Sequence, residues 1–279
     1  MKFWKMNGAG NDFIVINNIE EKIPEEKLSG IAAKLCDRRM SIGADGFMAV
    51  EKSDKGDYKM LFFNADGSAG EMCGNGARCI CRYGFENGLA GNTQEIETTA
   101  GTVTGYRLSG RMFKIRLNNP SVVKLDLVLE ADGKRVAADY VELGDPGIPH
   151  AAVRITGLKD KTFEELRSLG KALRYHSAFP KGANVNFYDV ESDGSITEKT
   201  YERGVEDFTY ACGTGSGSVV LCLALKGETD GDNVRLSVPG GELFVTAEIE
   251  ENGDCGNLWL TGPTNIVCRG EVTDEDLII

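Results

Sequence analysis

The 279-residue chain has 41% hydrophobic and 27% charged residues, a composition typical of globular proteins that excludes a disordered or fibrous chain. Its net charge of -12 would repel phosphate backbones and anionic lipid head groups, so we expect neither nucleic acid nor a membrane as a partner. The opening residues lack the apolar run of a secretory signal, and no apolar stretch reaches the ~18 residues of a membrane span. We therefore expect a soluble cytoplasmic protein with one large domain or two moderate ones.

The first half of the chain combines short strand patterns with one marked helix. Its predicted strands are residues 1–6, 13–17, 58–63 and 112–117. The turn Asn7-Gly8-Ala9-Gly10 predicts a hairpin between the first two. After Pro24 the spacing of four apolar residues predicts a helix: Leu28, Ile31, Ala32 and Leu35.

The second half repeats this scheme. Its predicted strands are residues 151–155, 184–190 and 197–203, and Thr162 and Glu165 form a capping box that predicts a helix over 163–174. Asn118-Asn119-Pro120 marks the boundary between halves, because proline after two turn-forming residues ends a strand. We expect an α+β fold of two similar lobes, 1–118 and 119–264, with residues 265–279 returning to the first lobe.

The sharpest local signal is a motif that occurs twice, Met72-Cys73-Gly74-Asn75-Gly76 and Ala211-Cys212-Gly213-Thr214-Gly215. Each copy follows a strand and a polar, acidic loop, and each leads into a helical pattern, at 77–85 and 218–225. Each cysteine is therefore expected at a helix N-terminus, among backbone N–H groups that have no partner within the helix.

A helix N-terminus favours two kinds of chemistry at these cysteines. It lowers the pKa of a thiol, which favours the thiolate as base or nucleophile. Its free N–H groups can also bind a carboxylate. Two such thiols suggest inversion of a carbon centre beside a carboxylate, where one thiolate removes a proton and the other thiol supplies one to the opposite face.

Three other interpretations are weaker on the residues alone. The cysteines could be small buried hydrophobic residues, the interpretation we prefer for the other six cysteines. A metal site is disfavoured, because there is no C-x-x-C pair and the only histidines are His150 and His176. A dithiol redox site also lacks C-x-x-C, and two thiols at separate helix ends suit opposed roles better than exchange.

At these residues the chain resembles the diaminopimelate epimerase family, cofactor-independent amino-acid epimerases with two similar α+β lobes. The likeness is carried by segments along nearly the whole chain: 7–13, 63–68, 73–79, Pro149-His150, Ala183-Asn184, 201–204, 211–215 and 239–241. Related proline racemases and hydroxyproline epimerases typically have His where this chain has Asn75. That difference, together with Glu202-Arg203, argues against them.

The resemblance implies a fold in which each lobe is an antiparallel sheet around a central helix, with the active site in the cleft between the lobes. It implies that Cys73 and Cys212 exchange the roles of acid and base and that His150 and Glu202 help to set thiol protonation. It implies a substrate-binding set of Asn11, Asn64, Gly74, Asn75, Asn184, Glu202, Arg203, Gly213 and Thr214. No metal and no cofactor is expected.

Two departures from the family pattern affect substrate and assembly. Ile148 replaces a family asparagine that contacts substrate, and Cys268 replaces a tyrosine associated with the homodimer. The leading hypothesis is interconversion of LL- and meso-diaminopimelate in lysine and peptidoglycan precursor synthesis. The alternatives are a racemase of another amino acid such as histidine, a noncatalytic amino-acid binder and a thiol-redox protein. A small-molecule amino acid is the expected partner, and a homodimer is left open.

Overall fold

The computed structural model describes residues 1–70, 73–273 and 275, so Met72 of the first cysteine motif and the end of the segment 265–279 lie outside it. The chain forms two compact units, Met1–Ile115 with Gly262–Ile279, and Arg116–Thr261. From the sequence we expected these changes at 118/119 and 264/265. Among the described residues, no helix has the length and apolar character needed to cross a membrane.

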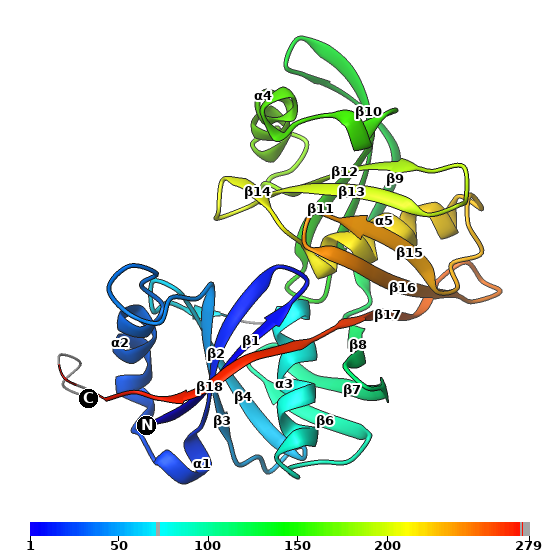
Figure 1. Cartoon of the computed structure of the whole chain (residues 1–279). Helices are drawn as coiled ribbons and strands as arrows, with labels where there is room; N and C mark the ends of the chain where they lie inside the picture. Colours follow the sequence, from blue (N-terminus) through cyan, green and yellow to red (C-terminus); the bar gives the residue numbers. More distant parts are fainter. Residues whose placement is uncertain (71–72, 274, 276–279) are drawn as a thin grey trace. The chain divides into compact units, whose positions relative to one another are not determined.

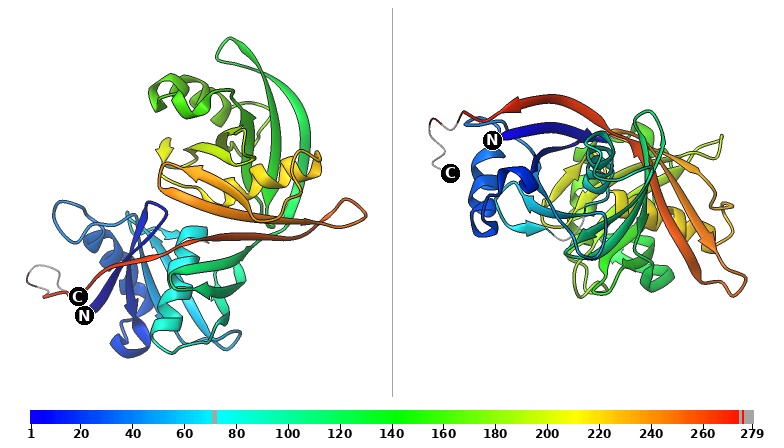
Figure 2. Two further views of the ribbon diagram at one scale, coloured as in Figure 1. Left: turned by 45° about the vertical axis from the view of Figure 1, so that its right-hand side comes forward. Right: turned by 90° about the horizontal axis from the view of Figure 1, so that it is seen from below.

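The first unit holds a sheet, two longer helices and one short helix (Figure 1). Its elements are β1 (Lys2–Gly8), β2 (Asn11–Asn17), α1 (Asn18–Glu21), α2 (Glu25–Leu35), β3 (Gly46–Glu51), β4 (Tyr58–Asn64), β5 (Ala69–Gly70), α3 (Gly74–Glu86), β6 (Thr93–Thr98), β7 (Gly101–Ser109), most of β8 (Met112–Leu117) and β18 (Asn265–Glu271). Strand β18 pairs with β1, as both views of Figure 2 show, so the end of the chain completes the sheet that its start begins.

The second unit repeats the order of the first. Its elements are β9 (Pro120–Ala131), β10 (Lys134–Leu143), β11 (Ile148–Arg154), the 3-10 turn η1 (Leu158–Asp160), α4 (Phe163–Arg174), β12 (Asn184–Val190), β13 (Ile196–Glu202), β14 (Asp207–Thr209), α5 (Gly213–Leu225), β15 (Val234–Val238), β16 (Gly241–Ile249) and most of β17 (Cys255–Pro263). The run from β11 through α4 and α5 to β16 matches the run from β2 through α2 and α3 to β7. The expected pair of similar lobes is confirmed.

The sheets contain parallel strand pairs in addition to the expected antiparallel ones. The first unit contains the parallel pairs β2–β3 and β4–β6, and the second contains β11–β12 and β13–β15 at the matching positions. The cause is the connections: α2 joins β2 to β3, α4 joins β11 to β12, and a helical crossover lets the chain re-enter a sheet in the same direction. Other strand pairs within the units, such as β1–β2 and β12–β13, are antiparallel.

Local sequence signals account for most of these elements. The hairpin of β1 and β2 forms around the predicted turn. Helix α2 buries the four predicted apolar residues, Leu28, Ile31, Ala32 and Leu35. Helix α4 begins at the predicted capping box: the Thr162 hydroxyl accepts from the Glu165 backbone N–H, and the Glu165 carboxylate accepts from the Thr162 backbone N–H. These predictions are confirmed.

Helices α3 and α5 lie at the centre of their units. Helix α3 packs against β1, β2 and β7, and α5 packs against β10, β11, β12 and β16. Nearly every residue of the first two turns of both helices is buried, which is typical of a helix covered on all sides. The expected central helices are confirmed, and each begins immediately after a cysteine of the repeated motif.

Candidate active site

Cys73 and Cys212 occupy the same structural position in their units. Each is the N-cap residue of a central helix with extended backbone, and neither side chain caps its own helix. The helices begin at Gly74 and Gly213, several residues earlier than the sequence pattern predicted. The four residues Gly74, Asn75, Gly213 and Thr214 therefore belong to first helical turns, whose N–H groups have no acceptor within the helix.

Glycine in these first turns lets the helix approach its neighbours closely. A Cβ atom at Gly76 would lie 2.6 Å from Met48 Cε on β3, and one at Gly215 would overlap the Oδ1 atom of Asn186 on β12. Both residues are therefore required by packing as well as by the motif. The sequence analysis expected each cysteine at a helix N-terminus, and this prediction is confirmed.

In the first unit, Asn75 joins the helix to the hairpin. Its side chain is buried and donates to Asn11 Oδ1 at 2.7 Å, while its own Oδ1 accepts from Arg78 at 2.8 Å. Asn11 lies at the first position of β2 and donates to Asp45 at 3.0 Å. Two of the predicted binding residues are thus brought together, and each is held by a partner on both ends of its amide.

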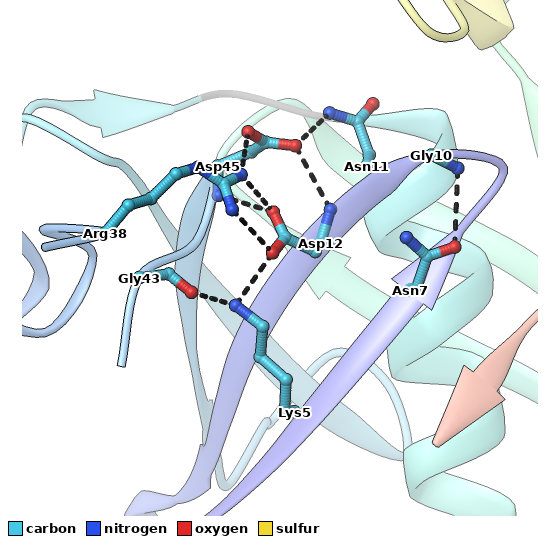
Figure 3. A network of polar contacts seen from close by, with 8 residues as sticks. All are labelled: Lys5, Asn7, Gly10, Asn11, Asp12, Arg38, Gly43 and Asp45. Atoms are coloured by element: carbon cyan, nitrogen blue, oxygen red, sulfur yellow. Dashed lines mark hydrogen bonds and ion pairs between the residues drawn. The ribbon is translucent and has the colours of Figure 1, made fainter. Parts of the chain in front are cut away.

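A network of charges fixes the hairpin tip that carries Asn11 (Figure 3). Asp12 pairs with Lys5 at 2.8 Å and with Arg38 at 2.6 Å, and Arg38 also pairs with Asp45 at 2.7 Å. These cations outweigh the effect of burial and lower the pKa of Asp12 to about 2. Asp12 is therefore ionised at neutral pH, and the network orients Asn11 through Asp45.

Arg78, which the sequence analysis did not single out, is the largest fully buried side chain among the described residues. It bonds to Gly74 O and Asn75 Oδ1, and its Nε atom has no partner among the described residues. Burial lowers its pKa to about 10, and the nearby Cys79 and Cys73 thiols act against that shift. Arg78 is still a cation at neutral pH, and a cation near Cys73 favours its thiolate.

Asn64, the other binding residue predicted in the first unit, is exposed at the end of β4. Its side chain donates to Ser68 Oγ at 3.0 Å and its backbone N–H donates to Ser68 O. Asn64 therefore closes the acidic loop that precedes the first cysteine.

In the second unit, the environment of Cys212 overturns the expected effect of the helix end. The residue is 8% exposed, and its Sγ atom lies 3.6 Å from Thr214 Oγ1. Burial and then the negative charge of Glu202 raise the pKa of Cys212 well above its ordinary value, against the lowering effect of Thr214 and the Gly215 N–H. Cys212 is a neutral thiol in this structure, and the prediction of a lowered pKa is wrong here.

His150 lies fully buried on β11, behind the first turn of α5. Its Nδ1 atom is 3.3 Å from the Asn186 amide nitrogen, which donates to it, because Asn186 Oδ1 accepts from Thr200. The proton of the neutral ring is therefore on Nε2, which has no partner among the described residues. Burial lowers the pKa of His150 to about 3, so the ring is uncharged at neutral pH.

Asn184 and Arg203 meet at the ends of their strands. The Asn184 amide donates to Pro149 O at 3.1 Å and accepts from the Arg203 backbone N–H at 2.8 Å. The Asn184 side chain therefore links β12, on which it lies, to β11 and to the end of β13. The Arg203 guanidinium is exposed and makes a 3.3 Å bond to Lys181 O. Glu202 precedes it at the end of β13, half buried.

The remaining predicted positions are placed as follows. Ile148, at the start of β11, is half buried, and Cys268 is exposed on β18. Cys36, Cys79, Cys81 and Cys222 are buried, and burial raises the pKa of each. No disulfide joins the described cysteines, and no group of three His, Cys, Asp or Glu side chains within the described ranges could hold a metal ion.

Sequence reasoning missed two further residues beside Cys212, namely Glu198 on β13 and Ser216 on α5. Both are buried and their side chains lie 2.5 Å apart. A signal was available: Glu198 has the same parity along β13 as the buried Ile196 and Thr200, which places a charged residue on a buried face.

The chain matches known proteins along nearly its whole length. The family model described as diaminopimelate epimerase matches residues 3–106 and 144–267. The diaminopimelate epimerase of Aquifex aeolicus is 37% identical over 99% of each chain, and that of Carboxydothermus hydrogenoformans is 34% identical over 97% of this chain and 99% of its own.

Solved structures show the same fold at lower identity. A phenazine biosynthesis protein of the PhzF family from Bacillus anthracis is 16% identical, with a TM-score of 0.75 over 98% of each chain. A probable proline racemase from Agrobacterium radiobacter K84 is 19% identical, with a TM-score of 0.72 over 98% of this chain and 93% of its own. With the full-length match to the family model and to relatives above 30% identity, the chain belongs to the diaminopimelate epimerase family.

Proposed function

We propose that this protein interconverts LL- and meso-diaminopimelate by removing and replacing the proton on one α-carbon. The observation that carries the proposal is the pair of thiols at the N-caps of α3 and α5, in a chain that matches diaminopimelate epimerases from end to end. No oxidation or group transfer is involved. The α C–H bond breaks toward one sulfur, and a new C–H bond forms from the other.

The protonation states described above assign a starting role to each thiol. Cys212 is a neutral thiol because of burial and Glu202, so it is the proton donor of the resting protein. Cys73 lies near the Arg78 cation, which favours the thiolate that takes the substrate proton. After one turnover the two roles are exchanged. The N–H groups of Gly74, Asn75, Gly213 and Thr214 would stabilise the carboxylate as it gains enediolate character.

His150 would act as a hydrogen-bond donor, since a ring with a pKa of about 3 carries no charge at neutral pH. Its Nε2–H group is the only polar atom of the ring that has no partner among the described residues. It can therefore lower the pKa of a neighbouring thiol only by donating a hydrogen bond to the sulfur.

The distal end of the substrate has one strong candidate ligand. Asn11 and Asn184 already use both ends of their amides within the protein. Arg203 has an exposed guanidinium with a single long bond, so it can pair with a second carboxylate in the bidentate manner that arginine favours. This agrees with a substrate that has two amino-acid ends.

Deuterium exchange tests the proposed reaction directly. LL-diaminopimelate, meso-diaminopimelate, histidine and lysine are each incubated with the protein in deuterated water, and incorporation at the α-carbon is followed by mass spectrometry. We expect exchange and inversion only with the two diaminopimelate isomers. Faster exchange of histidine than of diaminopimelate would contradict the substrate.

Cysteine variants test the mechanism in the same assay. Cys73→Ala and Cys212→Ala should each abolish inversion, because each face of the carbon needs its own acid or base. Cys268→Ala, which removes an exposed cysteine, is the matched control and should retain full activity. Inversion by either of the first two variants would overturn the two-thiol mechanism.

We also propose that the protein works in the cytoplasm, with a homodimer as its candidate assembly. Sedimentation of the purified chain distinguishes monomer from dimer, and fractionation of the host cell tests the compartment.

A further inference from the structure

A chain of buried hydroxyl and carboxyl groups leads from β13 to the cysteine at the start of α5. Glu198 is 1% exposed and Ser216 is fully buried. Ser216 Oγ lies 2.5 Å from Glu198 Oε2 and 3.2 Å from the backbone O of Cys212. The Cys212 carbonyl also accepts from the Ser216 backbone N–H at 2.9 Å. Ser216 is thus the link between the carboxyl group and the catalytic residue.

Counting hydrogens shows what this geometry requires. The Ser216 hydroxyl has one hydrogen and two oxygen atoms within reach that could accept it. If Glu198 is ionised, that hydrogen must go to the carboxylate and the Cys212 carbonyl loses its side-chain donor. If Glu198 is protonated, it donates to Ser216 Oγ, and Ser216 donates to Cys212. Only the protonated acid provides a hydrogen for both short contacts.

The surroundings of Glu198 also favour the neutral form. Among the described residues, its Oε1 atom has no hydrogen-bond partner and no ion pair includes its carboxyl group. An ionised carboxylate accepts with both oxygens and loses a large solvation energy on burial unless it is paired. An ionised Glu198 would have one hydrogen bond, from Ser216, and no cation as an ion-pair partner.

Lys159, Lys161, Lys199 and Arg235 line the same cavity as Glu198, but no ion pair within the described residues joins one of them to it. Other titratable groups on the elements packed against Glu198 are Tyr188 opposite it on β12, Glu202 farther along β13, and Cys212 and Cys222 on α5. The residues of β15 that share the buried face are apolar: Leu236 and Val238. Lys226, which ends α5, pairs with Asp126 and Asp139 instead. Burial, opposed only by Ser216, raises the pKa of Glu198 to about 8.

We propose that Glu198, held as a neutral carboxylic acid, is a positioning residue for Cys212: it donates to Ser216, and Ser216 donates to the Cys212 carbonyl and fixes that cysteine at the N-cap of α5. The proposal rests on the assignment of Cys212 as a catalytic thiol in the proposed function.

The protonation of Glu198 then controls the thiol. When Glu198 loses its proton, the donor to Ser216 disappears and a negative charge appears near Cys212, where it raises the pKa of the thiol further. Cys212 becomes harder to convert to the thiolate at alkaline pH, which is the form it needs when it acts as the base. Activity in that direction should therefore decline as Glu198 ionises.

The first experiment detects the proton on Glu198 without using activity. The infrared spectrum of the wild-type protein at pH 6 should contain the carbonyl band of a protonated carboxyl group, which Glu198→Gln should remove. Glu242→Gln, which changes an exposed glutamate on β16, is the control and should keep the band. An identical spectrum for wild type and Glu198→Gln at pH 6 overturns the proposal.

The second experiment follows the reactivity of Cys212 alone. The rate of iodoacetamide alkylation of Cys212 is measured against pH by peptide mass spectrometry in a Cys73→Ala background. We expect the wild-type pH profile to rise less steeply above pH 8 than that of Glu198→Gln, in which the amide stays neutral and still donates to Ser216. Superimposable profiles for the wild type and Glu198→Gln would contradict the proposal that Glu198 controls the reactivity of Cys212.

Ser216→Ala tests the link itself. It removes the hydroxyl between Glu198 and Cys212, and we expect kcat to fall about tenfold with KM nearly unchanged. Ser218→Ala is the matched control, because Ser218 is also buried on α5 and bonds to a carbonyl four residues back, that of Thr214, but has no carboxyl partner. Equal effects of the two variants on kcat would mean that Ser216 is merely structural.

Failure of the proposed function gives a different pattern. If wild-type protein did not exchange deuterium into diaminopimelate, the infrared and alkylation results could still appear as expected, because neither needs substrate. If the exchange occurs and these two results do not, the positioning role of Glu198 is wrong and the two-thiol reaction stands. Circular dichroism and thermal melting confirm that each variant is folded before it is compared.

Discussion

At Cys212, burial and the charge of Glu202 act on the thiol more strongly than the end of helix α5 does. The sequence was enough to identify both cysteines, because a repeated C-G-x-G before a helical pattern has a recognisable spacing. It could not reveal the direction of the pKa shift, because burial is produced by β12, β13 and α5 together. The burial of Arg78 has no local sequence signal either, and for Glu198 the alternation along β13 indicates a buried face but not the direction of the pKa shift.

Arg78 allows a prediction at this scale. Arg78→Met leaves Asn75 Oδ1 without its donor, at a cost of about 1–3 kcal/mol in the free energy of unfolding, measured by urea denaturation. It should also slow alkylation of Cys73 at neutral pH, because the cation that favours the thiolate is lost. Arg39→Met, at an exposed arginine, is the control and should change neither quantity.

Arg203 allows a second prediction. Arg203→Ala removes the candidate partner of the distal carboxylate, and charge-assisted bonds contribute about 1.5–3 kcal/mol, so kcat/KM for diaminopimelate should fall roughly 10- to 150-fold. Arg235→Ala removes another solvent-accessible arginine of the same unit, one paired with Asp193 and Glu242, and should leave kcat/KM unchanged. Unchanged turnover in Arg203→Ala would exclude this residue from substrate binding.

At the scale of elements, the local sequence pattern predicts the apolar parts of the two central helices but not the residues at which they begin. Periodicity predicted the apolar parts at 77–85 and 218–225. The helices begin earlier, at Gly74 and Gly213, and Gly76 and Gly215 in their first turns lie close to Met48 and Asn186, residues distant in sequence. By contrast, α2 and α4 begin and end near their predicted positions, since a proline and a capping box act on their own backbone.

Two glycine substitutions separate packing from helix propensity. Gly215→Ala would overlap Asn186 Oδ1, so we expect it to destabilise the protein and disturb the N-cap at Cys212. Gly30→Ala lies within α2 with no neighbouring atom near the new methyl group, so it should increase the free energy of unfolding by about 0.5–1 kcal/mol. Urea denaturation measures both. A stabilised Gly215→Ala variant would show that the α5 start is not closely packed.

At the scale of the whole molecule, the same arrangement of strands and helices occurs twice, and the charged groups buried near the central helix differ between the two units. Matching parallel pairs and matching helices recur in both units, and the cysteine stands at the same place in each. Yet the first unit buries a cation beside its cysteine, and the second buries a carboxyl group. The two cysteines of the repeated scaffold therefore have different electrostatic surroundings, which agrees with the proposed reaction that needs one acid and one base.

The buried carboxyl group of Glu198 should make the free energy of unfolding depend on pH. The pKa of Glu198 is about 8 in the folded chain against 4.5 ordinarily, so between these values the folded state holds a proton that the unfolded state has lost. The free energy of unfolding therefore falls as pH rises from about 4.5 to about 8. In Glu198→Gln this fall should be reduced, as measured by urea denaturation at several pH values. The same slope in both proteins would show that Glu198 does not keep its proton.

The sequence by itself determined the α+β class, the repeat, the positions of the hairpin and of helices α2 and α4, and the two cysteines, because these depend on periodicity, turn chemistry and spacing along the chain. Tertiary structure decided which strands run parallel, where α3 and α5 begin and which polar groups are buried beneath them. Burial and charge at a given atom are sums over segments distant in sequence, and the proton affinities of Cys212, His150 and Glu198 follow from those sums.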